Sequence, residues 1–187
     1  MGLPEDKAEL RERMRAARAR IPESEREAAV GSIAERLVRA TETHGSVMGF
    51  LSFGSELPTL PLLERLAREG HPLVVPHIED GELTPVSFSP GEQLAEAVWG
   101  IPEPADLRPV DPLSIDVVIA PGLGFDRRGF RIGYGGGFYD RLFTRMRPDV
   151  VRIGVGFHVQ LVAEVPHGEG DEPLGIVITE RETIVCR

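Results

Sequence analysis

A glycine-rich segment, residues 121–141, holds the residues of this chain best suited to bind an anionic ligand. Glycines have no Cβ, so backbone N–H groups there can approach a ligand closely and adopt positive φ values. A helix that begins directly after such a loop adds unpaired N–H donors and the positive end of its dipole. Arginines are frequent in and just after the segment, namely Arg127, Arg128, Arg131, Arg141, Arg145 and Arg147. The segment therefore predicts an anion site, most plausibly for phosphate.

The same segment matches neither of two common phosphate-binding fingerprints. It contains no G-x-x-x-x-G-K-[ST] string, so it is not a Walker A loop, and no G-x-G-x-x-G string, so the dinucleotide fingerprint is absent. The alternative to an anion site is a structural crossover loop whose glycines only satisfy the geometry of its turns. The neighbouring arginines favour the anion site.

Lys7 is the only lysine of the chain, and every other basic residue is an arginine. A chain that uses arginine for general positive charge but keeps one lysine indicates a need for a compact ammonium group. Arg11 lies one helical turn further along the first predicted helix, so the two side chains share one face. The alternative is that Lys7 is a solvated charge on that helix.

Three acids and one tryptophan could serve a binding site, although each has an ordinary explanation. Asp140 is in the first turn of the helix predicted after the glycine-rich loop, where the helix dipole alone favours a carboxylate. Asp171 lies among glutamates and is typical of a solvated acidic loop, and Glu56 follows a strand end in a turn where acids are usually exposed. A lone tryptophan such as Trp99 is more often core than ligand-binding. The histidines show no metal-ligand spacing.

An alternation of helices and strands must position these residues. The periodicity predicts helices at 4–20, 23–42, 59–69, 93–98 and 138–146. It predicts strands at 47–53, 73–75, 83–88, 115–120, 151–157, 174–179 and 183–186, and a proline-rich loop at 101–112. This pattern predicts an α/β fold, a single-domain three-layer sandwich with a mostly parallel sheet and helices on both faces. We expect one domain over residues 1–187, with the helices of residues 1–42 packing on the α/β core.

The predicted sheet also indicates where a ligand would bind. Ligands of such sheets lie at the carboxyl ends of strands. The glycine-rich loop follows the carboxyl end of one predicted strand, and the turn at residues 54–58 follows another. Both are therefore placed where this class of fold binds its ligands.

Composition limits the classes of function. With 187 residues, of which 41% are hydrophobic and 27% charged, the chain is typical of a soluble globular domain with one substantial core. The net charge of −9 argues against a general binder of nucleic acid or acidic membranes, which needs a basic surface. The single cysteine, Cys186, cannot form an internal disulfide, and no membrane-spanning run or secretory signal is visible. We therefore expect a cytoplasmic protein.

The string PGLGFDRRGFRIGYGGGFYDR, residues 121–141, closely resembles the signature of the 5-formyltetrahydrofolate cyclo-ligase family, also called methenyltetrahydrofolate synthetases. Further segments resemble the family in the same order along the chain. They are residues 7–11 (KAELR), 50–59 (FLSFGSELPT), 99–104 (WGIPEP) and 165–171 (VPHGEGD). The resemblance thus extends along nearly the whole chain.

The resemblance implies an ATP- and Mg²⁺-dependent enzyme that converts 5-formyltetrahydrofolate to 5,10-methenyltetrahydrofolate, ADP and phosphate through an iminium phosphate intermediate. It implies a catalytic role for Lys7, Arg131 and Tyr139. It implies that ATP is bound by Lys7, Arg11, Arg131, Gly133, Tyr134, Gly135, Gly136, Gly137 and Asp140. It places Glu56, Trp99, Phe138 and Tyr139 at the folate, which could be polyglutamylated, and Asp140 and Asp171 at Mg²⁺. We expect a monomer that binds neither nucleic acid nor membrane.

The sequence departs from the family pattern at three positions. Phe138 stands where many members have tyrosine, Gly136 where some have lysine, and Gly175 where an aspartate often follows leucine. The last departure puts in doubt any support of the Asp171 loop from that side. Two other functions stay open at this point. One is a non-catalytic folate- or nucleotide-binding protein, and the other is an enzyme resembling sugar-phosphate isomerases, which would need a catalytic base beside the loop.

Overall fold

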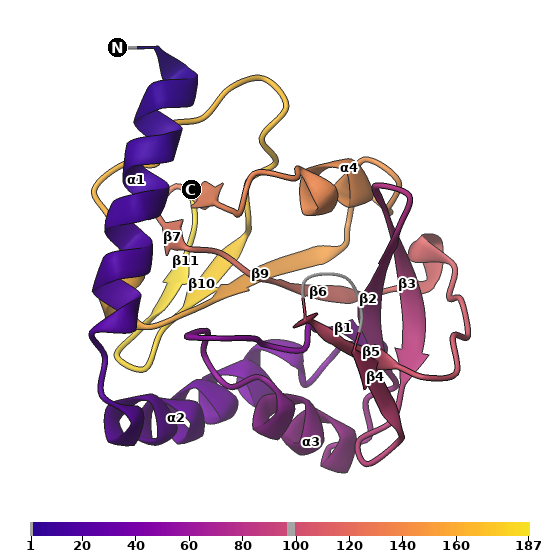
Figure 1. Ribbon diagram of the computed structural model, residues 1–187. Coiled ribbons are helices and arrows are strands. Elements are labelled where there is room, and N and C mark those ends of the chain that lie inside the picture. Colours follow the sequence, from indigo (N-terminus) through magenta and orange to yellow (C-terminus); the bar gives the residue numbers. More distant parts are fainter. Residues whose placement is uncertain (1, 97–99) are drawn as a thin grey trace.

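The centre of the computed structural model, which describes residues 2–96 and 100–187, is a seven-stranded sheet (Figure 1). The strands stand in the order β11-β10-β9-β6-β1-β2-β3. Their bounds are β1 Val47–Met48, β2 Leu73–Glu79, β3 Glu82–Phe88, β6 Val117–Ala120, β9 Val151–Val155, β10 Ile176–Ile178 and β11 Thr183–Val185. Neighbours from β10 to β2 are parallel, whereas β11 and β3 are antiparallel edge strands. The predicted α/β fold with a mostly parallel sheet is confirmed.

Helices cover both faces of this sheet. They are α2 (Glu23–Thr41) and α3 (Leu60–Arg68) on one face and α4 (Phe138–Phe143) on the other. Successive residues of a strand point to opposite faces. Accordingly, Ile119 of β6 packs in the cluster that holds Leu37 of α2, while Val118 packs in the cluster that holds Phe143 of α4. Within the described residues, no helix combines the length and the apolar character needed to cross a bilayer.

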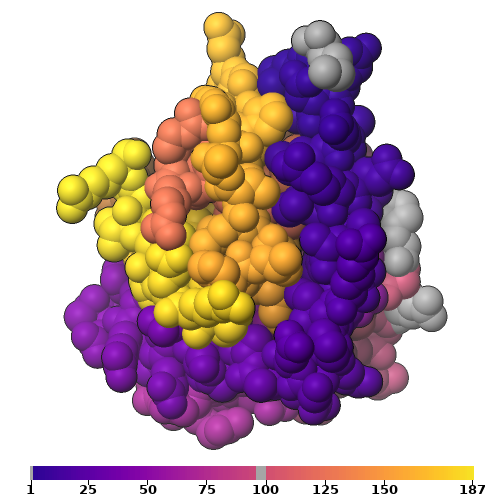
Figure 2. Space-filling view, turned by 90° about the vertical axis from the view of Figure 1, so that its left-hand side faces the viewer, coloured from indigo at the N-terminus to yellow at the C-terminus, as the bar shows by residue number. Residues whose placement is uncertain are grey.

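The N-terminal helix α1 (Leu3–Ala19) packs against segments from the second half of the chain. Its buried residues Leu10 and Met14 belong to one cluster with Leu123, Ile132 and Val165. Figure 2 shows this arrangement from the side, where the indigo helix lies beside orange segments near residue 160. The charged face of α1 is thereby held close to the glycine-rich segment, although more than a hundred residues separate the two in sequence.

The strand predicted at 47–53 is shorter than expected, because β1 ends at Met48. After Met48, hydrogen bonds that involve side chains take the place of pairing between strands. The Thr59 hydroxyl accepts a hydrogen bond from the Ser52 N–H at 2.9 Å and donates to the Phe50 carbonyl at 2.5 Å, and the Thr59 N–H donates to the Ser52 hydroxyl at 3.2 Å. Such bonds from serine and threonine compete with regular structure, so residues 50–59 form a closed loop.

The helix predicted at 93–98 is wrong over its described part. Residues Leu94–Glu96 form strand β4, which pairs antiparallel with β5 (Pro102–Pro104), inside the stretch expected to be a loop. Helix α4 also ends earlier than predicted, at Phe143, whereas the strand predicted at 73–75 extends to Glu79 because β2 pairs with β3 along its whole length. Long-range pairing overrides local propensity in these segments.

The glycine-rich segment begins with a short hairpin that the sequence did not predict. Strand β7 (Gly124–Phe125) pairs with β8 (Arg131–Ile132), and the fully buried carboxylate of Asp126 closes the turn. That carboxylate accepts hydrogen bonds from the N–H groups of Arg128, Phe130 and Val165. The loop between β8 and α4 is therefore short, residues 133–137, and four of its five residues are glycines.

Candidate active site

A cavity of about 610 Å³ lies between α1, the glycine loop at residues 133–137, the loop after β1 and the strands β2 and β5. This volume lies within the roughly 300–1,000 Å³ of typical ligand sites. Phe50 and Pro121, which follow the carboxyl ends of β1 and β6, line it, as expected for a parallel sheet. The predicted site residues that line the cavity are Lys7, Arg11, Glu56, Arg131, Gly133, Tyr134, Gly135, Gly136, Gly137, Phe138, Tyr139, Asp140 and Asp171. Trp99 lies outside the described residues.

The glycine loop, which lines this cavity, has unused backbone donors. Gly135 and Gly137 have φ values of 112° and 65°, a region that strongly favours glycine. Arg11 Nε donates to the Gly133 carbonyl at 2.9 Å, and Arg141 Nη1 donates to the Gly136 carbonyl at 2.8 Å. Within the described residues, the N–H groups of residues 134–137 donate no hydrogen bond to protein. A loop with fixed carbonyls and unused N–H groups suits an anion.

Two of the departures from the family pattern are structurally linked in this loop. A Cβ on Gly136 would lie 2.3 Å from the ring of Phe138, so that ring occupies the space that a side chain at 136 needs. Arg141 stacks over the same ring, with its Cζ 5.2 Å from the ring centroid. The glycine at 136 therefore fits the present position of Phe138.

Two ion pairs lie at the end of the cavity nearest α4. Lys7 Nζ contacts Asp171 Oδ2 at 2.5 Å, and Arg131 Nη2 contacts Asp140 Oδ1 at 3.1 Å. Burial alone would raise the pKa of Asp171, but hydrogen bonds from Lys7 and the Gly168 N–H, together with the charges of Lys7 and Arg131, lower it overall. Burial lowers the pKa of Arg131, and the Asp140 carboxylate opposes that shift.

The two carboxylates form a donor set that fits Mg²⁺ bound together with phosphate. Asp140 Oδ1 accepts from Arg131 and from the Glu172 N–H, and Asp171 Oδ2 accepts from Lys7 and from the Gly168 N–H. Asp140 Oδ2 and Asp171 Oδ1 accept no hydrogen bond from the described residues. No group of three or more His, Cys, Asp or Glu residues gathers there as a metal site in the described chain, so phosphate and water oxygens would complete the coordination that Mg²⁺ requires.

Glu56 is buried, with only 6% of its surface exposed, rather than lying in the exposed turn that is usual for such an acid. Its Oε1 accepts from the Tyr134 hydroxyl at 2.5 Å and its Oε2 from the Phe53 N–H at 3.1 Å. Burial raises the pKa of Glu56, while these hydrogen bonds and the charge of Arg18 oppose the rise. Burial and the Glu56 carboxylate raise the pKa of Tyr134 to about 12.

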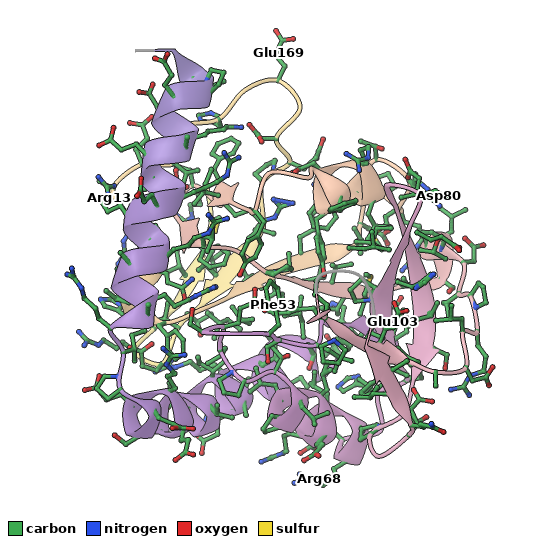
Figure 3. All side chains as sticks on the ribbon, viewed as in Figure 1. Arg13, Phe53, Arg68, Asp80, Glu103 and Glu169 are labelled. Carbon is green, nitrogen blue, oxygen red and sulfur yellow. The ribbon has the colours of Figure 1, made fainter. Side chains whose placement is uncertain are left out.

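The remaining residues that line the cavity are mostly apolar and were not among the predicted site residues. They are Phe50, Leu51, Phe53, Pro76, Ile78, Ile101, Pro121 and Ile132, with Glu103 as a polar member. Glu103 Oε2 lies 2.7 Å from His77 Nδ1 (Figure 3 labels Phe53 and Glu103). Pro76 and Ile78 are two residues apart in β2 and so share a face. That signal could have been found had the strand been predicted at its full length.

Two buried polar atoms beside the cavity lack a partner among the described residues. They are the Tyr139 hydroxyl and Arg131 Nε. Arg131 Cζ lies 5.8 Å from the centroid of the Tyr139 ring, so both atoms are close to the same part of the wall. Unpaired buried polar atoms are rare in proteins and call for an explanation.

Comparisons with known proteins identify the family of this chain. A model of the 5-formyltetrahydrofolate cyclo-ligase family matches residues 4–180. The 5-formyltetrahydrofolate cyclo-ligase of Escherichia coli K12 is 39% identical over 140 residues, which cover 72% of this chain and 77% of that protein. The enzyme of the same name from Mycolicibacterium smegmatis is 28% identical and is covered, like this chain, over 98% of its length.

Solved structures also resemble this chain. The 5,10-methenyltetrahydrofolate synthetase of Aquifex aeolicus superposes with a TM-score of 0.84 at 28% identity, covering 97% of this chain and 93% of that one. The Mycoplasma pneumoniae 5,10-methenyltetrahydrofolate synthetase gives a TM-score of 0.76 at 19% identity over 94% of this chain and 99% of that one. The second similarity supports the fold alone.

Proposed function

The chain belongs to the 5-formyltetrahydrofolate cyclo-ligase family, and we propose that it converts 5-formyltetrahydrofolate to 5,10-methenyltetrahydrofolate with consumption of ATP. The observation that carries this proposal is the cavity. The described residues that the sequence assigned to ATP, folate and metal all line it, although they come from segments far apart in the chain. The roles of the individual residues are part of the proposal.

We assign the phosphates of ATP to the glycine loop and the neighbouring cations. Residues 134–137, whose N–H groups are unused within the described residues, line the cavity together with Lys7, Arg11 and Arg131. The folate is assigned to the apolar wall and Glu56, together with Phe138 and Tyr139, which line the same cavity. Trp99 is retained as a proposed folate contact on the family resemblance alone.

The proposed chemistry begins with the formyl oxygen, which is a poor leaving group. This oxygen attacks the γ-phosphorus of ATP, ADP leaves, and N5 carries an iminium phosphate. N10 then attacks the activated carbon, phosphate departs with the former formyl oxygen, and the N10 proton is lost to solvent. Such a reaction depends on positioning and charge neutralisation rather than on a protein nucleophile. Lys7 and Arg131 supply the positive charge, and Tyr139 is the third residue assigned to catalysis.

Mg²⁺, when bound, would neutralise phosphate charge, and Asp140 and Asp171 are the residues that would hold it. In the protein without ligand, Asp140 forms an ion pair with Arg131, and Asp171 forms one with Lys7. We further propose that the protein is a cytoplasmic monomer and that it accepts folate in the polyglutamylated form.

A turnover assay tests the proposed function. Purified protein is incubated with 5-formyltetrahydrofolate, and the methenyl chromophore is followed with and without ATP and Mg²⁺. We expect product only when nucleotide and divalent cation are both present. Product formation without ATP, or none with any nucleotide, would contradict the proposal. Binding of both ligands without turnover would instead indicate a non-catalytic binding protein.

A further inference from the structure

Tyr134 belongs to the glycine loop by its backbone but to the folate side of the cavity by its hydroxyl. It stands between Gly133 and Gly135, and Arg11 holds the Gly133 carbonyl. Its hydroxyl lies 2.5 Å from Glu56 Oε1 and 2.9 Å from Arg18 Nη2. Its ring lies 5.5 Å from that of Phe53, centroid to centroid. The sequence assigned Tyr134 to ATP, whereas its hydroxyl bonds to Glu56, the carboxylate proposed for the folate, and to Arg18.

The hydrogen-bond partners of the Tyr134 hydroxyl fix the direction of its O–H bond. An arginine side chain only donates hydrogen bonds. The Tyr134 oxygen must therefore accept from Arg18, and its single O–H is left to donate to Glu56. Arg18 is itself fixed, because it is 5% exposed and its Nε donates to the Ser55 hydroxyl at 3.1 Å. The two hydrogen bonds therefore run in one direction, from Arg18 to Tyr134 and from Tyr134 to Glu56.

We propose that Tyr134 is a positioning residue for Glu56, which it holds in one orientation and in the acceptor-only form that a folate N–H group requires. The inference rests on the proposed function and deepens it, because it assigns a loop residue to folate recognition. With Oε2 bound to the Phe53 N–H and Oε1 to Tyr134, the carboxylate cannot rotate without breaking a hydrogen bond. Each carboxylate oxygen retains a further lone pair for the ligand.

The surroundings of Glu56 explain why one hydroxyl matters. Burial raises the pKa of Glu56. Of the effects that oppose this rise, the Tyr134 hydrogen bond is the largest, followed by the hydrogen bond from the Phe53 N–H and the charge of Arg18. The groups that face Glu56 are Arg18 of α1, Tyr134 of the glycine loop and Tyr139 of α4. A groove on the outer side adds Glu23, Arg26 and Glu27 of α2. Removing the Tyr134 hydroxyl must therefore raise the pKa of Glu56 further.

The test compares Tyr134→Phe with wild type by steady-state kinetics and by equilibrium binding of 5-formyltetrahydrofolate without nucleotide. Phenylalanine keeps the ring against Phe53 and removes only the hydroxyl. We expect KM and Kd for 5-formyltetrahydrofolate to rise about tenfold, as for a hydrogen bond to a charged group. KM for ATP should stay within about twofold. The acid limb of the kcat/KM profile for folate should move to higher pH, because Glu56 takes up its proton earlier.

Two further variants sharpen the result. Arg15→Gln is the matched control, because Arg15 is exposed and contacts the Tyr134 ring, with its Cζ 5.7 Å from the centroid, but not the hydroxyl. It should leave both KM values and the pH profile unchanged. In a Glu56→Gln background, Tyr134→Phe should add little, because the two residues act as one unit.

The outcomes separate this inference from the proposed function. If wild-type protein binds no 5-formyltetrahydrofolate, the proposed function fails. If wild type binds it and Tyr134→Phe binds it equally well with an unshifted pH profile, the positioning role fails. A rise in KM for ATP alone would overturn the inference and return Tyr134 to the nucleotide. Thermal unfolding of each variant confirms that the comparison is made between folded proteins.

Discussion

At the scale of single residues, the two ion pairs at the nucleotide end join a proposed phosphate ligand to a proposed metal ligand. Lys7 pairs with Asp171, and Arg131 pairs with Asp140. Both pairs are partly buried, so a charge that loses its partner there costs desolvation free energy. If phosphate binds Lys7 or Arg131, the Asp171 or Asp140 carboxylate loses its partner. Binding of a metal cation to that carboxylate then becomes more favourable. The residues thus explain why nucleotide and metal would bind together.

The role of Lys7 can be tested by two substitutions. Lys7→Ala removes the ammonium from the cavity, so we expect a KM for ATP raised at least about tenfold. The fold should persist, because the hydrophobic contacts of α1 are made by Leu10 and Met14. Lys7→Arg should also impair turnover, because a planar fork does not replace a compact ammonium at close range. Unchanged KM for ATP and unchanged turnover in both variants would make Lys7 a structural partner of Asp171 only.

The shared metal predicts how Asp140 and Asp171 depend on each other. Each change to asparagine keeps the size of the side chain but removes a negative charge facing the phosphates. Both single variants should lose turnover far more than folate binding, because the metal acts on the phosphoryl group that is transferred. The double variant should be scarcely worse than the poorer single one, since residues that serve one ion are not additive. Kinetics and folate binding of the three variants measure this.

A different result is expected if the helix dipole alone explains Asp140. In that case Asp140→Asn would cost roughly 0.3–1 kcal/mol of stability and little activity. Near-normal turnover of Asp171→Asn at saturating Mg²⁺ would exclude a site made of these two carboxylates. Glu172, whose N–H donates to Asp140, would then be the next acid to examine.

At the scale of elements, local signals predicted the helices better than the strands. α1, α2 and α3 end within about two residues of their predicted bounds, because proline, glycine and apolar spacing mark them in the sequence itself. β4 and β5 could not be predicted in the same way. Their regular structure comes from pairing with each other, whereas local signals predicted a helix over β4 and a proline-rich loop over β5. The short hairpin of β7 and β8 depends likewise on the buried Asp126, whose partners include the distant Val165.

A matched pair of glycine substitutions tests how tightly that hairpin is held. Gly129 has a φ of 92°, and a Cβ there would lie 2.1 Å from the Leu174 carbonyl oxygen, which is backbone and cannot easily move. We expect Gly129→Ala to lower the free energy of unfolding by more than the roughly 1–3 kcal/mol that a strained backbone conformation costs by itself. Denaturant unfolding measures it.

Gly31, in the middle of α2, is the control for this change. A Cβ on Gly31 would meet nothing within 4 Å, and its φ is not in the left-handed region. Gly31→Ala should therefore stabilise the protein by about 0.5–1 kcal/mol, because alanine is the better helix former. Opposite signs for the two variants support the description of both elements. If Gly129→Ala leaves the free energy of unfolding unchanged, the hairpin must shift to make room for the added methyl group.

At the scale of the whole molecule, the cavity is made by segments from both halves of the chain. α1 supplies Lys7 and Arg11, the loop after β1 supplies Glu56, and a loop near the C-terminus supplies Asp171. The sequence could name these residues, because each lies in a short segment that resembles the family. It could not place them relative to one another or reveal the partners of Glu56. Arg18 was not singled out, although it lies on α1 at helical spacing from Arg11.

Because ligand contacts join the two ends of the chain, nucleotide binding should stabilise the whole fold. ATP with Mg²⁺ at 100 times its Kd should add about 2.7 kcal/mol, since a site built from distant segments exists only in the folded state. For a domain of this size, that corresponds to roughly 5–11 °C in Tm. Lys7→Ala should lose most of this shift. Arg13→Ala should keep it, because Arg13 is exposed on α1 and points away from the cavity (Figure 3). Thermal unfolding with and without nucleotide measures the shift, and a full shift in Lys7→Ala would show that α1 takes no part in holding the nucleotide.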